Sequence, residues 1–290
     1  MTTRYDLDRE ALGALLVGEP RYRVDQVWQG LYRQRTDPDA MTSLPLRLRE
    51  RLRDELPRAL TAETDSVTED GDTVKRLWRL RDGPRIETVL MHYPDRATVC
   101  VSTQAGGAMA CGFCATGQAG FDRQLSSGEI VEQVVWASRR AARRAGGPQR
   151  VSNVVFMGMG EPLANYDAVW RAVERLHHDL GLSARHLTIS TVGIVPGIRR
   201  LAAAALPVNL AVSLHAANDT LRDELVPVNR RDPLAALAEA CRTHVETTRR
   251  RLSLEWALID AVNDRASDAR ELAAFARPLR AHVNLIPLNP

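Results

Sequence analysis

Two cysteines, Cys111 and Cys114, are the residues of this chain that most directly suggest chemistry. They lie in a glycine-rich stretch, GGAMACGFCATGQAGF (residues 106–121), directly behind an apolar, strand-like run. A cysteine at position 107 would complete the C-x3-C-x2-C spacing of an iron–sulfur site, but that position is Gly107. Three thiolates on a four-iron cluster would leave one iron open to a substrate. The loop therefore predicts either a cluster site or a cluster site that lacks one ligand.

A zinc site and a redox-active dithiol are the two other interpretations of the CxxC pair. A structural zinc site needs four ligands, and the sequence has no second CxxC and no spaced histidine pair. A thioredoxin-like dithiol prefers a helix N-terminus, where the helix dipole stabilises the thiolate. Here the residues ATGQAG separate Cys114 from the next predicted helix, which begins at Ser127. The residues alone leave all three interpretations open.

Further polar groups follow other strand-like runs of the sequence. GMGEP (158–162) combines bare backbone, which a ligand can approach closely, with a carboxylate that could hold an ammonium group. SLH (213–215) places a hydroxyl and an imidazole at the end of a buried strand. Each group also has a structural explanation: a turn glutamate, a core histidine or a hydroxyl that satisfies the backbone. The candidates are Gly160, Glu161, Ser190, Ser213, Leu214, His215 and Asn289.

Glu87 is a separate candidate because it lies just before the first strand of the regular pattern, at 97–103. It lies in RIETVLMHY, one of two strands that we predict on either side of the turn RDGP. A carboxylate that leans over the mouth of a barrel can serve as a general base. The alternative is an ion pair on the surface.

The elements that must position these residues alternate between strands and helices. Such alternation predicts right-handed βα units and a parallel sheet, so we expect an α/β fold, a partial (β/α)6 TIM-like barrel. Loops at the C-terminal ends of parallel strands share one face, and there the candidate residues would converge. The expected strands are 97–103, 151–158, 186–191, 207–216, 252–259 and 282–288. The expected helices are 127–145, 165–179, 194–204, 232–248 and 267–280.

The N-terminal part has a different pattern. Residues 1–70 show helical spacing, including an apolar stripe in RVDQVWQGLYRQR, and the pattern then changes to the two strands around RDGP. We therefore expect three parts. They are a small helical domain (1–70), a β connector (71–95) and a barrel domain (96–290).

Composition limits the class of protein. The 290 residues include 44% hydrophobic and 26% charged residues, as in a globular domain, and no apolar run is long enough to cross a membrane. The N-terminus lacks a signal-peptide core, and four cysteines do not make a disulfide framework, so we expect a cytoplasmic protein. Lys75 is the only lysine, and the arginines cluster as in SRRAARRAGGPQR (138–150). Biased codon usage can explain the arginines, but they also permit a nucleic-acid partner.

Several long motifs make the chain resemble a known family. RATVCVSTQAGGAMACGFCATGQAGF, NVVFMGMGEPLANYD, LTISTVGIVPGI, AVSLHAANDTLRDELVPVN and HVNLIPLNP resemble the radical S-adenosylmethionine (SAM) methyltransferases of the RlmN/Cfr type. The resemblance implies the radical SAM fold and a [4Fe–4S] cluster that cleaves SAM to a 5′-deoxyadenosyl radical. It also implies methylation of adenine C2 in 23S rRNA and tRNA, with a reducing partner such as flavodoxin. The resemblance further implies that the helical domain of residues 1–70 binds RNA. We expect a monomer.

The resemblance assigns roles to matching positions only. Cys111 and Cys114 match two of the three cluster ligands, and Glu87 matches the family's proposed proton acceptor. The SAM contacts match Gly160, Glu161, Ser190, Ser213, Leu214, His215 and Asn289.

Two departures from the family pattern predict impaired activity. Gly107 replaces the first cluster ligand, and the chain stops at Pro290, before the segment that carries the family's methyl-bearing cysteine. From these departures we expect a C-terminally truncated barrel that holds iron poorly and does not methylate RNA. Two alternatives to a C2 methyltransferase follow: a remnant that binds RNA or SAM without methylation, and a C8-specific rRNA adenine methyltransferase.

Overall fold

The chain forms two compact units, neither of which is continuous in sequence. The computed structural model describes residues 2–107, 109, 112–118, 120–144 and 146–288. The first unit contains residues 1–102, 125–154 and 167–183, and the second contains residues 103–124, 155–166 and 184–290. The three-part domain division expected from the sequence stays a prediction. None of the helices in the described ranges is both long and apolar enough to cross a membrane.

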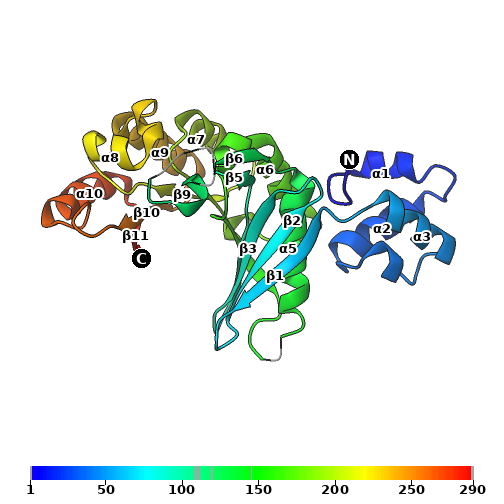
Figure 1. Ribbon diagram of the computed structural model, residues 1–290. Helices are drawn as coiled ribbons and strands as arrows, with labels where there is room; N and C mark the ends of the chain where they lie inside the picture. Colours follow the sequence, from blue (N-terminus) through cyan, green and yellow to red (C-terminus); the bar gives the residue numbers. More distant parts are fainter. Residues whose placement is uncertain (1, 108, 110–111, 119, 145, 289–290) are drawn as a thin grey trace. The chain divides into compact units, whose positions relative to one another are not determined.

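Three helices open the first unit (Figure 1), within the part of the chain where the sequence predicts helical structure. Asp8 begins the first of them, because its side chain accepts a hydrogen bond from the backbone N–H of Ala11 at 2.7 Å. The predicted apolar stripe is confirmed in the second helix, where Val27 and Leu31 are buried. The helices are α1 (Arg9–Leu15), α2 (Tyr22–Tyr32) and α3 (Leu46–Glu55), with a 3₁₀ turn at Pro38–Ala40.

An antiparallel sheet follows, and it corrects the prediction that residues 1–70 are helical throughout. Leu60–Val67 form strand β1, which pairs with β2 (Thr73–Leu80). The pattern of β1 alone is not strand-like, and it becomes a strand because β2 satisfies its backbone groups. The two strands expected around RDGP are confirmed as β2 and β3 (Arg85–His92), and β3 pairs with β4 (Ala97–Cys100).

The long helix α5 (Ser127–Ala141) lies beside β1, β2 and β3 within the first unit (Figure 1). Ser126 and Glu129 form a capping box at its start. Gln133 connects the helix to the strands: its Oε1 accepts from Thr88 Oγ1 at 2.8 Å and from Ser102 N at 2.9 Å. Since these groups are buried and mutually satisfied, they fix the position of α5 against β3 and the end of β4. Helix α6 (Tyr166–Glu174) continues into a π-helical turn at Arg175–Asp179.

Parallel strands and connecting helices make up most of the second unit. The strand order is β1-β2-β3-β4 within the first unit and β8-β9-β10-β11 within the second, where neighbouring strands pair in parallel. The division between the units falls within β7. This confirms the predicted α/β fold with a largely parallel sheet. The strands are β7 (Val151–Phe156), β8 (Leu187–Thr191), β9 (Asn209–Ser213), β10 (Leu252–Leu258) and β11 (His282–Pro287). The helices are α7 (Val195–Ala202), α8 (Asp219–Leu225), α9 (Leu234–Thr248) and α10 (Ala266–Leu279). Short 3₁₀ turns lie at Pro162–Asn165, Ala184–His186 and Pro227–Arg230.

The glycine-rich stretch has more structure than the sequence predicts. Strands β5 (Gln104–Gly106) and β6 (Phe121–Gln124) form a small hairpin, and helix α4 (Ala115–Gln118) starts directly after Cys114. The expectation that the next helix begins only at Ser127 is therefore wrong. Gly106 has a φ of +77°, and a Cβ there would lie 2.0 Å from the carbonyl oxygen of Gly120. Glycine at 106 is thus a requirement of the hairpin.

Two helical glycines of the first unit provide a test of packing. A Cβ at Gly128, in the first turn of α5, would lie 2.6 Å from Asp6 Oδ1, whereas a Cβ at Gly13 would meet only Val24 at 3.9 Å. We expect Gly128→Ala to lower the free energy of unfolding by about 1–3 kcal/mol, because Asp6 must move and its 2.7 Å hydrogen bond from Gly128 N is strained. Gly13→Ala, the control, should stabilise by up to about 1 kcal/mol. Urea unfolding measures both, and equal effects would contradict the packing at Gly128.

Candidate functional site

In the second unit, the segment 103–104 lies in close contact with the segment 159–161, and this contact positions the polar residues of the site. Thr103 N and Gln104 N both donate to the carbonyl oxygen of Met159, at 2.8 and 3.2 Å. Gly160 has a φ of +93°, and a Cβ there would lie 2.3 Å from the Cβ of Gln104. Glu161 N donates to Gln104 Oε1 at 2.8 Å. Only glycine permits this contact, which holds GMGEP against the segment that leads into the cysteine loop.

Glu161 is a buried carboxylate held by backbone donors. Its oxygens accept from Leu163 N at 2.9 Å and from Val192 N at 2.8 Å. Burial raises the pKa of Glu161 to about 7, although the hydrogen bonds from Val192, Leu163 and Thr191 act in the opposite direction. Each carboxylate oxygen offers two acceptor positions, so the group still has capacity for a bound cation. A cationic ligand would stabilise its ionised form.

His215 occupies a strained position at the end of β9. Its φ is +57°, which is uncommon for a residue other than glycine. The backbone N–H of Ala257 donates to Nδ1 at 3.0 Å, and Asn263 Nδ2 donates to the His215 carbonyl oxygen at 2.8 Å. Burial, with a smaller effect of the Arg222 charge, lowers the pKa of His215 to about 4. The ring is therefore neutral and carries its proton on Nε2, where it can donate.

The cysteine loop meets the same strand end through an aromatic contact. The rings of Phe113 and His215 lie 4.7 Å apart in an edge-to-face arrangement. Phe113 immediately precedes Cys114, which is half-buried. The structure thus brings the CxxC loop and the SLH segment together, as the sequence predicts for loops at strand ends.

Arg222, on α8, is a residue that the sequence analysis missed. It is fully buried, and it donates to the carbonyl oxygens of Leu214 (3.1 Å) and Val192 (2.6 Å) and to Asn229 Oδ1 (2.8 Å). It therefore ties the segment after β8 to the segment after β9. The signal was present in NDTLRDEL, where Asn218 caps a helix too polar for an apolar pattern to reveal.

The other predicted residues of the second unit have less specific surroundings. Ser190 is buried, Ser213 is half-buried, and Leu214 is buried with its N–H bonded to Glu255 O at 2.9 Å. Cys111 and Asn289 lie outside the described residues. The assignment of these residues to ligand binding stays a prediction.

Glu87 belongs to the first unit. Its carboxylate forms an ion pair with Lys75 at 3.2 Å, and both side chains are about half exposed. Ser102 Oγ donates to the Glu87 carbonyl oxygen at 2.6 Å, which fixes this part of β3 beside the end of β4. The surface ion pair, which the sequence analysis gave as the alternative for Glu87, is therefore present. A role of Glu87 as a general base stays a prediction.

The residues present do not fit a three-thiolate cluster site. Gly107 has no side chain, and its N–H is bonded to the carbonyl oxygen of Gly120 at 2.8 Å. Burial raises the pKa of Cys241, in α9, to about 12, so its thiol is a poor source of thiolate. Cys100 lies in β4 of the first unit. The described residues contain no group of three or more His, Cys, Asp or Glu side chains that could hold a metal ion.

The fold and the strand-end residues define the class of protein. Residues 101–254 match the family described as the radical SAM superfamily. The crystal structure of a radical SAM methyltransferase from Sphaerobacter thermophilus superposes with a TM-score of 0.94 and is 51% identical, covering 100% of this chain and 86% of that one. Members of this superfamily use a [4Fe–4S] cluster and SAM.

Curated relatives narrow the class to a family. The probable dual-specificity RNA methyltransferase RlmN of Chloroflexus aurantiacus is 54% identical over 99% of this chain and 80% of its own length. The protein with the same description from Frankia casuarinae is 55% identical over 96% of this chain and 68% of its own length. The chain therefore belongs to the RlmN family of radical SAM methyltransferases.

The raised pKa of Glu161 predicts a specific pH dependence of stability. The folded protein binds this proton more tightly than the unfolded chain, so stability falls as the pH rises from about 4.5 to about 7. Without ligand, we expect Glu161→Gln to reduce this slope by about 1 kcal/mol per pH unit. Glu132, buried with a pKa also raised to about 7 by burial, maintains the remaining slope. Unfolding by urea at several pH values measures this. Glu239→Gln, on an exposed part of α9, is the control, and an equal effect there would contradict the prediction.

The buried guanidinium of Arg222 predicts a large loss of stability on substitution. Arg222→Met removes donors from the carbonyl oxygens of Val192 and Leu214 and leaves them buried, so we expect a loss of about 3–5 kcal/mol. Arg242→Met, which breaks an exposed pair with Glu239, should change stability by less than about 1 kcal/mol. Thermal unfolding compares the two, and a small effect at Arg222 would show that the strand ends do not depend on it.

Proposed function

We propose that this chain is a SAM-dependent RNA methyltransferase whose target is C2 of adenine in 23S rRNA and tRNA. The observation that carries the proposal is the Gly160–Glu161 contact with Gln104, within a chain 54% identical to a dual-specificity RNA methyltransferase. The proposal includes a cytoplasmic monomer that receives electrons from a flavodoxin-type partner.

The second unit has groups of the kind that SAM requires. Bare backbone at Gly160 allows close approach, and the buried carboxylate of Glu161 suits the ammonium group of the ligand. The Nε2–H of His215 is available as a donor, because Nδ1 is occupied by the N–H of Ala257. The hydroxyl of Thr103 is buried without a hydrogen-bond partner among the described residues, so it is a further candidate contact. SAM supplies the methyl group when it is bound.

One observation favours a second candidate function, which is binding of RNA or SAM without methylation. Gly107 provides no thiolate, so the loop offers two cysteines where the family resemblance implies three. Ligand binding by Glu161 and His215 does not depend on position 107, whereas cluster assembly does.

Restoring a cysteine at position 107 separates the two candidates. After anaerobic reconstitution with iron and sulfide, we expect Gly107→Cys to bind several-fold more iron than the unchanged chain, because a third thiolate completes the ligand set. Gly112→Cys is the control, because it adds a thiol to the same loop at a position outside the C-x3-C-x2-C spacing. Iron and sulfide content and the EPR spectrum with and without SAM are the first measurements.

The product assay then decides the function. After incubation of a tRNA transcript with SAM and reductant, we expect mass spectrometry to detect 2-methyladenosine with Gly107→Cys and little or none with the unchanged chain, whose loop offers only two cysteines. SAM binding with no methylated adenosine from either protein would overturn the methyltransferase proposal in favour of the second candidate. 8-Methyladenosine would assign C8 specificity.

A further inference from the structure

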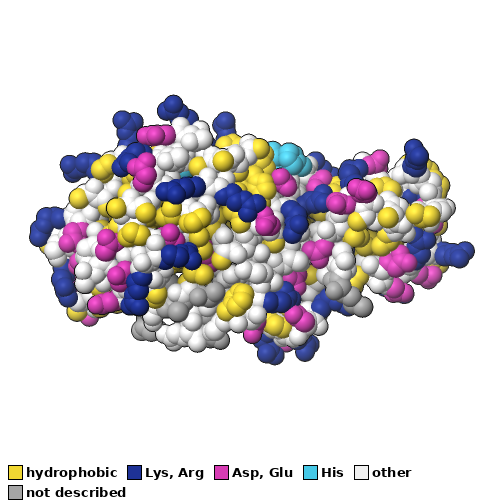
Figure 2. All heavy atoms as spheres, turned by 90° about the horizontal axis from the view of Figure 1, so that it is seen from above, with side chains coloured by type: hydrophobic (Ala, Val, Ile, Leu, Met, Phe, Trp, Pro, Cys, Tyr) yellow, Lys and Arg dark blue, Asp and Glu magenta, His cyan; other side chains and the backbone are white. Residues whose placement is uncertain are grey.

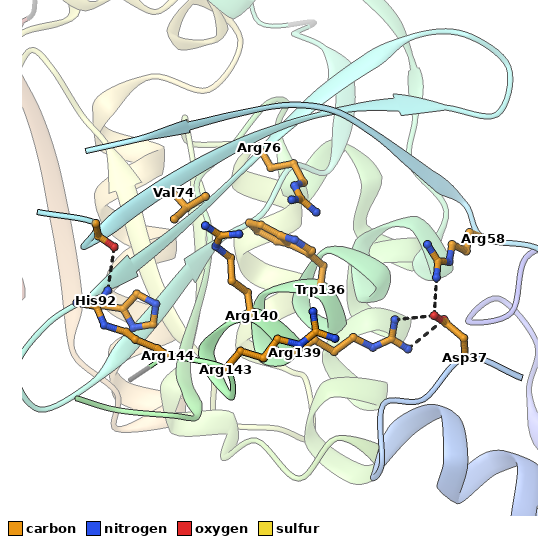
Figure 3. Close-up of a pocket in the computed structure, with 11 residues that line it drawn as sticks. Asp37, Arg58, Val74, Arg76, His92, Trp136, Arg139, Arg140, Arg143 and Arg144 are labelled. Atoms are coloured by element: carbon orange, nitrogen blue, oxygen red, sulfur yellow. Dashed lines mark hydrogen bonds and ion pairs between the residues drawn. The ribbon is translucent and has the colours of Figure 1, made fainter. Parts of the chain in front are cut away.

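An arginine-lined cavity lies in the first unit, outside the site described above. Its volume is about 490 Å³, and helix α5 with the turn that follows it forms one wall (Figure 3). Strands β2 and β3 contribute Val74, Arg76 and His92, and the segment before β1 contributes Arg58. The arginines of the lining are Arg58, Arg76, Arg139, Arg140, Arg143 and Arg144.

These guanidinium groups are only partly neutralised. Three aspartates pair with them. Asp37 pairs with Arg58 and Arg139, Asp65 with Arg76 and Arg140, and Asp72 with Arg144. Within the described residues, six lining arginines thus meet three carboxylates, which leaves an excess of three positive charges. Arg143 is exposed and has no ion pair in the described part of the chain. The cavity is therefore electropositive.

The pKa values of two titratable groups in the lining, Asp37 and His92, are shifted by this positive charge. Burial alone would raise the pKa of Asp37, but the hydrogen bond from Arg139 and the charges of Arg139, Arg4 and Arg58 hold it below its ordinary value. Burial and the charge of Arg144 lower the pKa of His92. Both directions agree with a positive potential at this position.

Another cavity is also rich in arginine, but its lining, Arg242, Arg249, Arg250, Arg251 and Arg280 among others, includes no Trp, Tyr or Phe. Figure 2 shows Lys and Arg side chains scattered among acidic and apolar ones over the face in view, without one continuous basic area. In the cavity of the first unit the arginines also surround an aromatic ring: the guanidinium of Arg76 lies 4.7 Å from the ring centroid of Trp136. Guanidinium groups beside an aromatic surface suit a ligand that has both phosphates and bases.

The spacing of the arginines fits a phosphate chain better than one phosphate. Arg139 and Arg140 lie in the last turn of helix α5, and Arg143 and Arg144 lie in the turn that follows it. The two pairs are four residues apart, which corresponds to about 6 Å along the helix axis. A second cavity of about 330 Å³ shares Arg58, Arg76, Trp136 and Arg139 with the first. Because they share these residues, the two cavities adjoin along α5, and we call them together the arginine channel.

We propose that this arginine channel binds consecutive backbone phosphates of RNA, with Arg140 and Arg143 as contacts and Trp136 as an aromatic surface for a base. The inference rests on the proposed function, because it assumes that RNA is the substrate. It adds a second contact region that positions RNA through its phosphates and does not select its sequence. Arg58, Arg76 and Arg139 maintain the shape of the channel through ion pairs of 2.5 to 3.1 Å. The pair between Arg140 and Asp65 is longer, at 3.5 Å, and Arg140 can exchange it for a phosphate.

Equilibrium binding of RNA tests the channel without catalysis. The probe is a 5′-fluorescein-labelled tRNA transcript, and anisotropy is measured without SAM or reductant from about 50 to about 300 mM KCl. For Arg140→Ala combined with Arg143→Ala, we expect the Kd to rise about five- to tenfold at low salt. The slope of log Kd against log salt should fall by about 1–2. The control is Arg270→Ala combined with Arg277→Ala, which removes the same charge from exposed positions of α10. It should change the Kd by less than about twofold.

The outcomes separate this inference from the proposed function. The channel proposal would be overturned if both double variants weakened RNA binding equally, or if neither weakened it. Competition by inorganic phosphate at submillimolar concentration, with an unchanged salt slope, would also overturn it and indicate a site for a small anion. If the channel variant loses RNA binding and neither the unchanged chain nor Gly107→Cys forms 2-methyladenosine, the channel is supported and only the methyltransferase proposal fails. Identical unfolding temperatures of both double variants exclude a folding defect.

Discussion

The contact between Gly160 and Gln104 is the constraint on which the candidate site depends. The carbonyl oxygen of Met159 accepts two backbone N–H groups, and Gln104 receives the N–H of Glu161, so the two segments can meet only where residue 160 has no side chain. This contact places the Glu161 carboxylate under the segment after β8. A side chain at position 160 would push the two segments apart. It would also displace the Glu161 carboxylate, because Glu161 follows Gly160 directly in the chain.

Burial of polar groups then gives the site its chemistry. Glu161 has a raised pKa and His215 a lowered pKa because both lie away from water. Arg222 holds the neighbouring carbonyl oxygens in place, so these groups keep their orientation without a ligand. Such an arrangement favours binding, since the cost of ordering the groups is met during folding. A cationic ligand near Glu161 would also recover part of the unfavourable burial of that carboxylate.

The two units have different chemistry, which suits the two ligands of the proposed function. The second unit contains buried, individually bonded polar groups suited to a small ligand. The first contains an electropositive channel in which Asp37, Asp65 and Asp72 hold most of the arginines by ion pairs. An excess of guanidinium groups suits a polyanion, because each bound phosphate neutralises charge that folding has brought together. Position 107 stands apart, since Gly107 contributes backbone hydrogen bonding but no ligand.

The sequence by itself determined where the strands of the parallel sheet lie along the chain, which helices separate them and which polar residues follow them. Periodic apolar patterns and turn residues are local signals, and motifs such as GMGEP and SLH follow them directly. Only the tertiary structure decided that Leu60–Val67 is a strand, that Arg222 is buried under two strand ends, and that Glu87 pairs with Lys75. It also decided that the arginines of α5 meet Arg76 and Arg58 in one cavity. These features depend on partners far away in sequence, which supply hydrogen bonds and charge that no local pattern contains.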